Sequence, residues 1–224
     1  MYINMLNYNS EGNDYMTKIY NWKEKIDKEE LDEVSKILKN NGIIIFPTET
    51  VYGIGGNALS NEVVDKVYNA KNRPRAKAVN IMVANKNEIE KYAEITSDIE
   101  QKLIDEFLPG PLTIILKKKN DFGNYFTAGN DTIGIRIPDH KIVNEILNKI
   151  DFPIIAPSAN ISGEPSGIEV SDIIEDFDGK VDAIIDGGKA CLGLSSTIVK
   201  VVDNEINILR YGKITKEELL NKIK

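Results

Sequence analysis

Four cations lie within the seven residues from Lys71 to Lys77 (KNRPRAK), in a chain whose formal net charge is -7. Arg73 precedes Pro74, and a residue before proline is biased toward an extended backbone. In an extended segment residues two apart share a face, so the four cations are expected to point the same way. Like charges on one face repel unless solvent or an anion separates them. The segment therefore predicts either a solvated surface loop or a triphosphate site, which suits the planar fork of Arg and the point charge of Lys.

A second polar segment, PTETVYGIGGNA (47–58), follows the apolar run GIIIF (42–46). Thr48, Glu49 and Thr50 place hydroxyls and a carboxylate at the end of that run, where α/β sheets often bind ligands. The glycines that follow allow tight backbone turns. Their spacing differs from the GxGxxG fingerprint, so a purely structural turn remains an alternative.

A third segment, PIIAPSANISGEPSG (153–167), runs from a predicted buried strand into a loop of Ser, Gly and Pro. Ser158, Asn160, Ser162 and Ser166 offer neutral donors and acceptors that suit a base, a ribose or a phosphate. Loops of this composition are also common turns, so the pattern alone is weakly specific.

Alternation in TIGIRIPDH (132–140) directs the isoleucines to the core and Arg136 to the opposite face, within reach of a carboxylate or phosphate. Asp139 is expected to cap the next helix, which makes His140 a surface histidine at a helix start. His140 is the only histidine and already has a structural explanation, which argues against a Ser-His-Asp arrangement and disfavours covalent serine catalysis.

The elements that must position these residues follow from the spacing of apolar side chains. Helices are expected from Asp27 through Leu38 and at 61–70, 97–107, 140–149, 170–176 and 215–223. Strands are expected at 42–46, 79–83, 112–116, 133–137, 153–156, 182–185, 197–202 and 206–210, the last two joined as a hairpin. Because helices interleave with strands, the fold class is an α/β (α+β) layered domain with a mixed sheet. Residues 1–20 are polar and Asn-rich and are expected to form a loose extension, with 21–224 as a single domain.

The composition limits the classes of function. No apolar run approaches the ~20 residues of a membrane span, and no secretory signal is evident. One cysteine, Cys191, and one histidine exclude an internal disulfide and a Cys/His metal site, so no metal ligands are expected in the protein. The acidic balance disfavours broad nucleic-acid binding but leaves room for a local basic pocket. The expected location is the cytoplasm.

Seven motifs occur together in one order: FPTETVYGIG, K-x-R-P (71–74), PGPLT, GIRIP, S-x-N (158–160), SST (195–197) and LRYG. Their joint order resembles the YrdC-type family, the threonylcarbamoyl-adenylate synthases of tRNA modification, over roughly residues 37–212. The resemblance implies a YrdC/RibB-like layered fold, with a large twisted mixed sheet flanked by helices. The chain lacks the additional C-terminal domain of longer members, so a single-domain form is expected.

The resemblance also implies a nucleotidyltransferase reaction. L-threonine, bicarbonate and ATP give threonylcarbamoyl-adenylate and pyrophosphate, with Mg2+ accompanying ATP. The product feeds t6A formation at adenosine 37 of tRNA, through a separate tRNA threonylcarbamoyl-transfer machinery. The implied mechanism uses positioning and electrostatic stabilisation rather than acid-base groups. The oligomeric state does not follow from the sequence.

Site roles follow from the same resemblance. Lys71 and Arg73 are the expected catalytic residues. The ATP contacts are expected to be Arg73, Lys77, Thr132, Ser158, Asn160, Ser166 and Arg210. The threonine contacts are expected to be Thr50, Arg136, Ala156 and Ser196.

The chain departs from the family pattern after K-x-R-P. Ala78 and Val79 replace a Pro-Leu pair, Asn80 replaces an apolar residue, and Met82 stands where many members carry histidine. These departures keep open a YciO-like paralogue with a different or weak reaction. A second alternative is an RNA-binding module that makes weak RNA contacts without this activity, because YrdC-like domains resemble one another in a concave basic surface linked to RNA binding; the net charge of -7 disfavours it.

Overall fold

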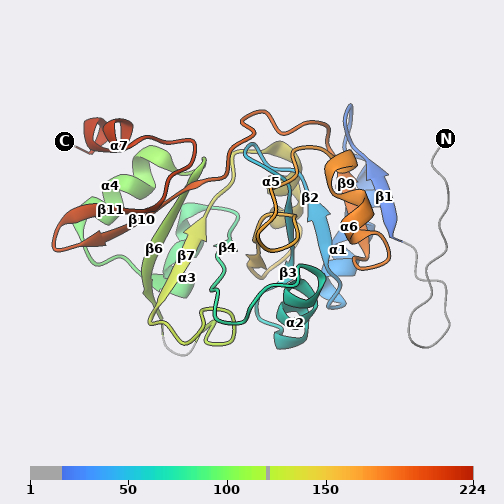
Figure 1. Cartoon of the computed structure of the whole chain (residues 1–224), viewed down its shortest axis with the longest axis horizontal. Helices are drawn as coiled ribbons and strands as arrows, with labels where there is room; N and C mark the ends of the chain where they lie inside the picture. Colours follow the sequence, from blue (N-terminus) through green and yellow to red (C-terminus); the bar gives the residue numbers. More distant parts are fainter. Residues whose placement is uncertain (1–16, 120–121, 224) are drawn as a thin grey trace.

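One mixed sheet of 11 strands runs through the part of the chain that the computed structural model describes, residues 17–119 and 122–223 (Figure 1). The strands are β1 (Lys18–Asn21), β2 (Ile44–Phe46), β3 (Gly53–Asn57), β4 (Ile81–Met82), β5 (Ala93–Glu94), β6 (Leu112–Lys118), β7 (Thr132–Arg136), β8 (Ile154–Ile155), β9 (Ala183–Asp186), β10 (Thr197–Val202) and β11 (Glu205–Arg210). The helices are α1 (Lys28–Lys39), α2 (Asn61–Ala70), α3 (Ile89–Tyr92), α4 (Asp98–Phe107), α5 (Lys141–Asn148), α6 (Ile174–Phe177) and α7 (Lys216–Lys222), with 3-10 turns η1 (Lys86–Glu88) and η2 (Val170–Asp172).

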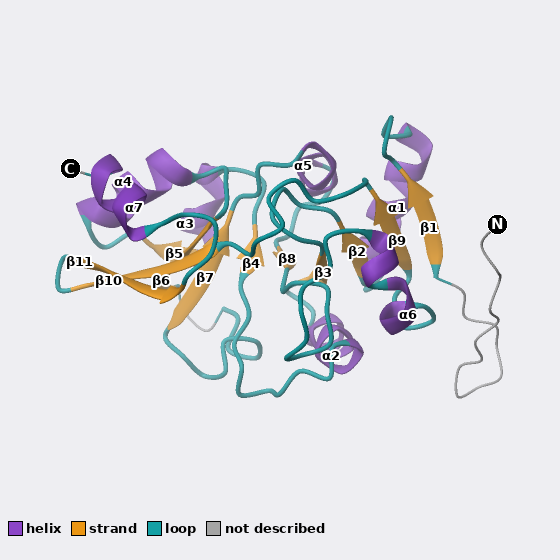
Figure 2. Cartoon of the chain, turned by 45° about the horizontal axis from the view of Figure 1, so that its top comes forward, coloured by secondary structure: helices purple, strands orange, loops and turns teal. Residues whose placement is uncertain are grey.

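The strand order is β1-β9-β2-β3-β8-β4-β7-β6-β10-β11, with β5 paired to β6 beside this path. The pairs β1–β9, β2–β9, β4–β7 and β6–β10 are parallel, and the other pairs are antiparallel. Helices cover both faces, with α1 and α5 on one and α2 and α6 on the other (Figure 2). The predicted mixed α/β sheet is confirmed.

The apolar spacing placed most elements correctly. Asp27 caps α1, since its carboxylate accepts from the backbone N–H of Glu29 and Glu30. Leu31, Val34 and Leu38 of that helix are buried against the strands β2 and β9. The β10–β11 hairpin turns through two residues with positive φ, as a tight turn of this hand requires.

Three local expectations were wrong. Lys18–Asn21 is a strand paired in parallel with β9, and Tyr20 is buried, so the sheet begins before the predicted boundary at residue 20. The rest of the predicted extension, residues 1–16, lies outside the described residues. The helix expected at 170–176 is the 3-10 turn η2 followed by the short α6. The helix cap expected at Asp139 is His140, which is half-buried rather than a surface residue.

The glycines of PTETVYGIGGNA belong to a strand, β3, and not only to a turn. Gly55 lies so close to β8 that an added Cβ would stand 1.9 Å from the carbonyl oxygen of Ile155. Only glycine allows that approach of two backbones. The composition suggested a turn because glycine weakens strand propensity, but the packing of β3 against β8 requires it.

No helix in residues 17–119 and 122–223 combines the length and apolar character needed to cross a membrane.

Candidate functional site

A cavity of about 380 Å³ opens over one face of the strands β4, β7, β6 and β10. Its floor follows the strand register, because Lys200 pairs with Ile115 and Ile115 pairs with Gly134 across the sheet. Alternate residues of a strand share a face, so the neighbours two positions along each strand continue the floor. These neighbours are Thr113, Thr132, Arg136 and Ile198.

The cavity is cationic in a chain that is acidic overall. Arg73, Arg136, Arg210 and Lys200 line it, and no acidic side chain is among the described residues that line it. Burial lowers the pKa of Arg210, and the positive charges of Arg136 and Arg73 lower it further. The three arginines therefore lie within one another's electrostatic field, which favours an anionic ligand between them.

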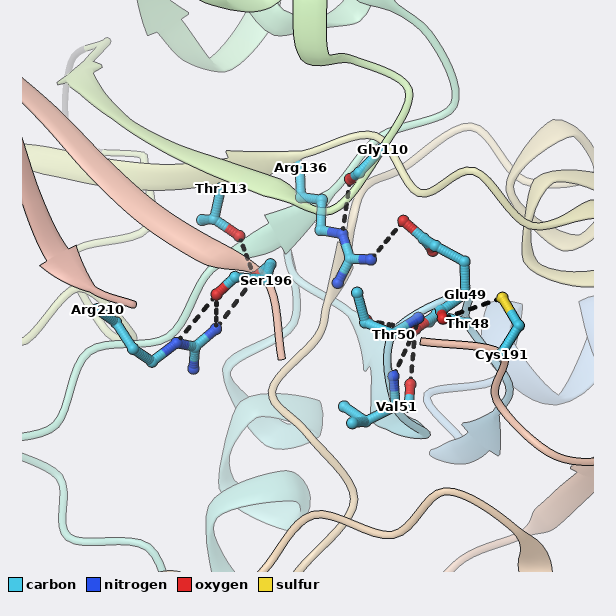
Figure 3. Close-up of polar contacts among 10 residues, drawn as sticks. All are labelled: Thr48, Glu49, Thr50, Val51, Gly110, Thr113, Arg136, Cys191, Ser196 and Arg210. Carbon is cyan, nitrogen blue, oxygen red and sulfur yellow. Dashed lines mark hydrogen bonds and ion pairs between the residues drawn. The ribbon is translucent and has the colours of Figure 1, made fainter. Parts of the chain in front are cut away.

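Arg136 is the most buried cation of the cavity, with a side chain that is 5% exposed. Its Nη2 donates to Oε1 of Glu49 at 2.7 Å, and its Nε donates to the carbonyl of Gly110 at 3.2 Å (Figure 3). Glu49 is nearly as buried, and its second oxygen, Oε2, has no partner among the described residues. The ion pair fixes one edge of the guanidinium and leaves the other edge toward the cavity.

Arg210 is held at the opposite wall by Ser196. Its Nε and Nη2 donate to the carbonyl of Ser196 at 3.2 and 2.8 Å, and Nη2 also reaches the Ser196 hydroxyl at 3.0 Å. That hydroxyl lies 2.8 Å from the hydroxyl of Thr113, which belongs to the neighbouring strand β6 (Figure 3). This hydrogen-bond network holds Arg210, Ser196 and Thr113 together at one wall of the cavity.

The loop after β2 is ordered by Thr48. Its hydroxyl donates to the carbonyl of Val51 at 2.6 Å and accepts from the backbone N–H of Thr50 at 3.1 Å. The carbonyl of Glu49 accepts from the backbone N–H of Leu192 at 2.9 Å, which docks the loop before β10 onto it. Thr50 consequently presents its side chain to the cavity from a fixed backbone.

Lys71 is 1% exposed and does not line the cavity. Its ammonium donates to the carbonyls of Ser158 and Asn160, the latter at 2.6 Å. The Ser158 hydroxyl in turn lies 2.6 Å from Oδ1 of Asn160. Burial, with a contribution from Arg73, lowers the pKa of Lys71 to about 7. Lys71 thus supports the S-x-N loop from beneath, and the expectation that it contacts substrate directly has no support in this geometry.

The four cations of KNRPRAK do not share a face, because the chain turns after α2 instead of extending. Arg73 lines the cavity and donates to the carbonyls of Lys77 and Ala78 at 3.1 and 2.7 Å. Arg75 points away from it, paired with Asp65 and lying 4.6 Å from the centre of the Tyr68 ring. The predicted common face was therefore wrong, and one of the four cations lines the site.

Most of the predicted site residues meet in this cavity. Its lining includes Thr50, Arg73, Thr132, Arg136, Ala156, Ser158, Ser196 and Arg210. The predicted residues that do not line it are Lys71, Lys77, Asn160 and Ser166. Sequence reasoning missed the lining residues Thr127, Asn130 and Lys200, and it noted Thr48, Thr113 and Ser195 only as parts of motifs, without a site role. Only strand alternation could have signalled Thr113 and Lys200, which share a face with Ile115 and Ile198.

The positions that depart from the family pattern form part of the cavity wall: Ala78, Val79, Asn80 and Met82. Their backbone is fixed, since Val79 donates to Phe126 at 3.1 Å and Asn80 accepts from Ala156 at 3.0 Å. Ala78 also holds Arg73 through its carbonyl. The substitutions therefore alter the surface of the cavity while the segment still supports a cation.

Residues 36–212 match the Sua5/YciO/YrdC family model, which is described as "Telomere recombination". The chain belongs to this family. The matched range includes every residue that lines the cavity and leaves out α7 and most of α1.

Relatives of the family are similar over most of this chain. A protein of Methanocaldococcus jannaschii named "Putative threonylcarbamoyl-AMP synthase" is 45% identical over 202 residues, which are 90% of this chain and 95% of the relative. A "Threonylcarbamoyl-AMP synthase" of Pyrococcus abyssi is 36% identical over 91% of this chain and 60% of its own length. This chain thus spans less than two thirds of the Pyrococcus relative.

A solved structure of the family, described as Pyrococcus abyssi Sua5 complexed with L-threonine, has a TM-score of 0.88 to this chain at 36% identity. The alignment covers 92% of this chain and 61% of that one. The family fold and the likeness in sequence therefore extend over most of this chain.

Proposed function

We propose that the protein is an L-threonylcarbamoyl-adenylate synthase, which makes the adenylate and pyrophosphate from L-threonine, bicarbonate and ATP. One observation carries the proposal: three arginines and a lysine surround a cavity whose described lining has no acidic side chain. Such a cavity selects ligands with several negative charges. Its volume of about 380 Å³ falls within the range of small-molecule sites, roughly 300–1,000 Å³. Relatives with synthase names supply the choice of reaction.

The nucleotide is assigned to the part of the cavity with Arg73 and Arg210. Arg73 is half-buried and Arg210 is exposed, and both keep part of the guanidinium free of acceptors among the described residues. Charge-assisted contacts of this kind suit the oxygens of a triphosphate. Thr132 and Ser158 provide neutral partners from the same lining. Ser166, Asn160 and Lys77 do not line the cavity, so contacts from them require the ligand to extend beyond it.

Threonine is assigned to the part with Arg136. The free edge of this guanidinium suits the carboxylate of the amino acid. Thr50 and Ser196 offer hydroxyls on either side, and Ala156 adds a small apolar wall. The Pyrococcus abyssi structure is a complex with L-threonine, which supports a threonine site in this family.

The chemical step needs positioning and charge stabilisation. Threonine's amine combines with bicarbonate, with loss of water, to give a carbamate. A carbamate oxygen then attacks the α-phosphorus of ATP, the bond to the bridging oxygen breaks, and pyrophosphate leaves with that oxygen. Arg73 and Arg210 would stabilise the charge that develops on the phosphates, and Arg136 would hold threonine in line. Lys71 acts through the loop of Ser158 and Asn160.

Mg2+ is expected to enter with ATP. The described residues contain no group of three or more His, Cys, Asp or Glu side chains that could hold a metal ion. The carboxylate nearest the site, Glu49, is already paired with Arg136. The donor set therefore does not fit a protein-held metal, and phosphate oxygens are the ligands that Mg2+ commonly uses with nucleotides.

The adenylate would be consumed by a separate machinery that transfers the threonylcarbamoyl group to adenosine 37 of tRNA. The expected compartment is the cytoplasm, where ATP and tRNA are available and a lone thiol stays reduced. Residues 21–224 are proposed to act as one domain, to which the strand of residues 18–21 also belongs.

The test is incubation of the purified protein with ATP, Mg2+, bicarbonate and labelled threonine. We expect the adenylate and pyrophosphate to form together, and only when threonine is present. Nucleotide binding without this product, under conditions in which a known synthase works, would favour a YciO-like paralogue. Tight binding of tRNA without nucleotide turnover would favour an RNA-binding module.

A further inference from the structure

Glu49 does not line the cavity, yet among the residues that the structure describes it is the only acid bonded to a cation that does. Its side chain is 8% exposed and does not line the cavity, whereas its partner Arg136 does. An acid and a base buried together in this way compensate each other's loss of hydration. The pair could stabilise the fold alone, or it could also orient Arg136 for a ligand.

The hydrogen bonds of Arg136 are unevenly distributed. Nε and Nη2 are held by Gly110 and Glu49, while Nη1 makes no hydrogen bond with any described residue (Figure 3). Nη1 is not one of the fully buried atoms that lack a partner, and Arg136 lines the cavity. The nitrogen is therefore open to the cavity. The guanidinium is therefore fixed at two nitrogens and presents the third to a ligand.

Glu49 is held as firmly as the cation that it contacts. Its carbonyl accepts from the N–H of Leu192 at 2.9 Å and from Sγ of Cys191 at 3.3 Å. Its carboxylate uses one oxygen on Arg136, and Oε2 is buried without a partner among the described residues. An unpaired buried acceptor is costly, and a pair selected for stability alone is expected to use both oxygens.

We propose that Glu49 is a positioning residue for threonine. It sets the plane of the Arg136 guanidinium so that Nη1 meets the substrate carboxylate, and it does so without contacting the substrate. The inference rests on the proposed function, because it assigns threonine to Arg136. The position of the Glu49 oxygen matters for this role, and its charge matters less.

Three substitutions separate position from charge. Glu49→Gln keeps the length and an oxygen acceptor but removes the charge. Glu49→Asp keeps the charge but withdraws the oxygen by one carbon–carbon bond, and Glu49→Ala removes both. We expect Glu49→Asp and Glu49→Ala to raise the KM and the Kd for L-threonine about tenfold or more, the effect of one lost charged contact. Glu49→Gln should stay within about threefold of the unmodified protein.

The measurements are steady-state kinetics and calorimetric titration of the full chain with L-threonine, and separately with ATP. If the role of Glu49 is purely structural, its substitution should weaken the binding of both L-threonine and ATP. If Glu49 positions Arg136, the Kd for ATP should stay within about twofold of that of the unmodified protein. If Glu49→Ala does not fold, Glu49→Asp, which keeps a buried carboxylate near Arg136, decides the question. If neither folds, the role is structural and the inference is wrong.

Other outcomes also contradict the proposal. Wild-type threonine binding in Glu49→Asp and Glu49→Ala would show that Arg136 needs no positioning. A large loss in Glu49→Gln with an active Glu49→Asp would show that charge, not position, matters. These results differ from failure of the proposed function, in which the unmodified protein itself forms no threonine-dependent product.

Discussion

Replacing Arg73 by alanine tests whether the cation cluster contains a phosphate site. Arg73 lines the cavity, and its Nε and Nη2 donate to the carbonyls of Lys77 and Ala78. Nη1 bonds to no described residue and remains for a ligand. Arg75, two residues along, carries the same charge but pairs with Asp65 outside the cavity. Arg75→Ala is therefore a matched control with an identical change of net charge.

The expected magnitude follows from one lost charge-assisted hydrogen bond in the transition state. Such a bond contributes about 1.5–3 kcal/mol. Since about 1.4 kcal/mol corresponds to a factor of ten, Arg73→Ala should lower kcat/KM for ATP by about 10- to 100-fold. The control pair is exposed and contributes about 1 kcal/mol or less to stability, so Arg75→Ala should stay within about twofold.

The assay is threonine-dependent pyrophosphate release at varied ATP, with the melting temperature of each variant recorded. The variant also loses two hydrogen bonds to carbonyls, so its assay must be run below the temperature at which it begins to unfold. Equal losses of kcat/KM in Arg73→Ala and Arg75→Ala would show that only the overall electrostatic field of the protein affects ATP, and not a contact from Arg73. An unchanged kcat/KM in Arg73→Ala would refute the assignment of the phosphates to this arginine.

Three further predictions concern Lys71, Gly134 and His140. Lys71→Met should lower the free energy of unfolding in urea by about 2–4 kcal/mol, because it leaves the carbonyls of Ser158 and Asn160 without their donor; a change below about 1 kcal/mol would contradict this support. Gly134→Ala would place a methyl 3.0 Å from Cβ of Asn80 on the cavity floor and should raise the Kd for ATP about tenfold, as measured by fluorescence titration. Unchanged affinity would show that the nucleotide does not lie over Gly134. Burial lowers the pKa of His140 below its ordinary 6.5, although Glu49 and Asp139 oppose the shift. The unfolded chain then binds the proton first as the pH falls, so stability is lost below pH 6.5, and His140→Asn should reduce that loss in denaturant titrations compared at neutral pH and near pH 5. If the stability of the variant depends on pH as steeply as that of the unmodified protein, His140 is not the source of the loss.

The sequence predicted the layered sheet because most of its strands are short apolar runs between turn residues. It missed β1, since KIYN (18–21) contains two polar residues and depends on β9, more than 160 residues later, for its partner. It also read the glycines of β3 as turns, because glycine has low strand propensity. The requirement for glycine comes from the approach of β8, which is a tertiary contact that local composition does not record.

The order of the motifs predicted most of the residues that line the candidate site. It did not predict the directions of their side chains. KNRPRAK was treated as one face, but Lys71, Arg73 and Arg75 bond to partners in different directions. Lys71 is buried under the S-x-N loop, and Arg75 finds Asp65 and Tyr68 on the preceding helix. Glu49 could not be paired with Arg136 from sequence, since the two are 87 residues apart.

If the proposed function holds, this cavity joins threonine, bicarbonate and ATP in one product. The most direct measurement is mass spectrometry of the adenylate made with ¹³C-bicarbonate. We expect a threonylcarbamoyl-adenylate one mass unit heavier than that made with ordinary bicarbonate, released together with pyrophosphate. An adenylate that takes up no carbon from bicarbonate, or no adenylate at all, would contradict it.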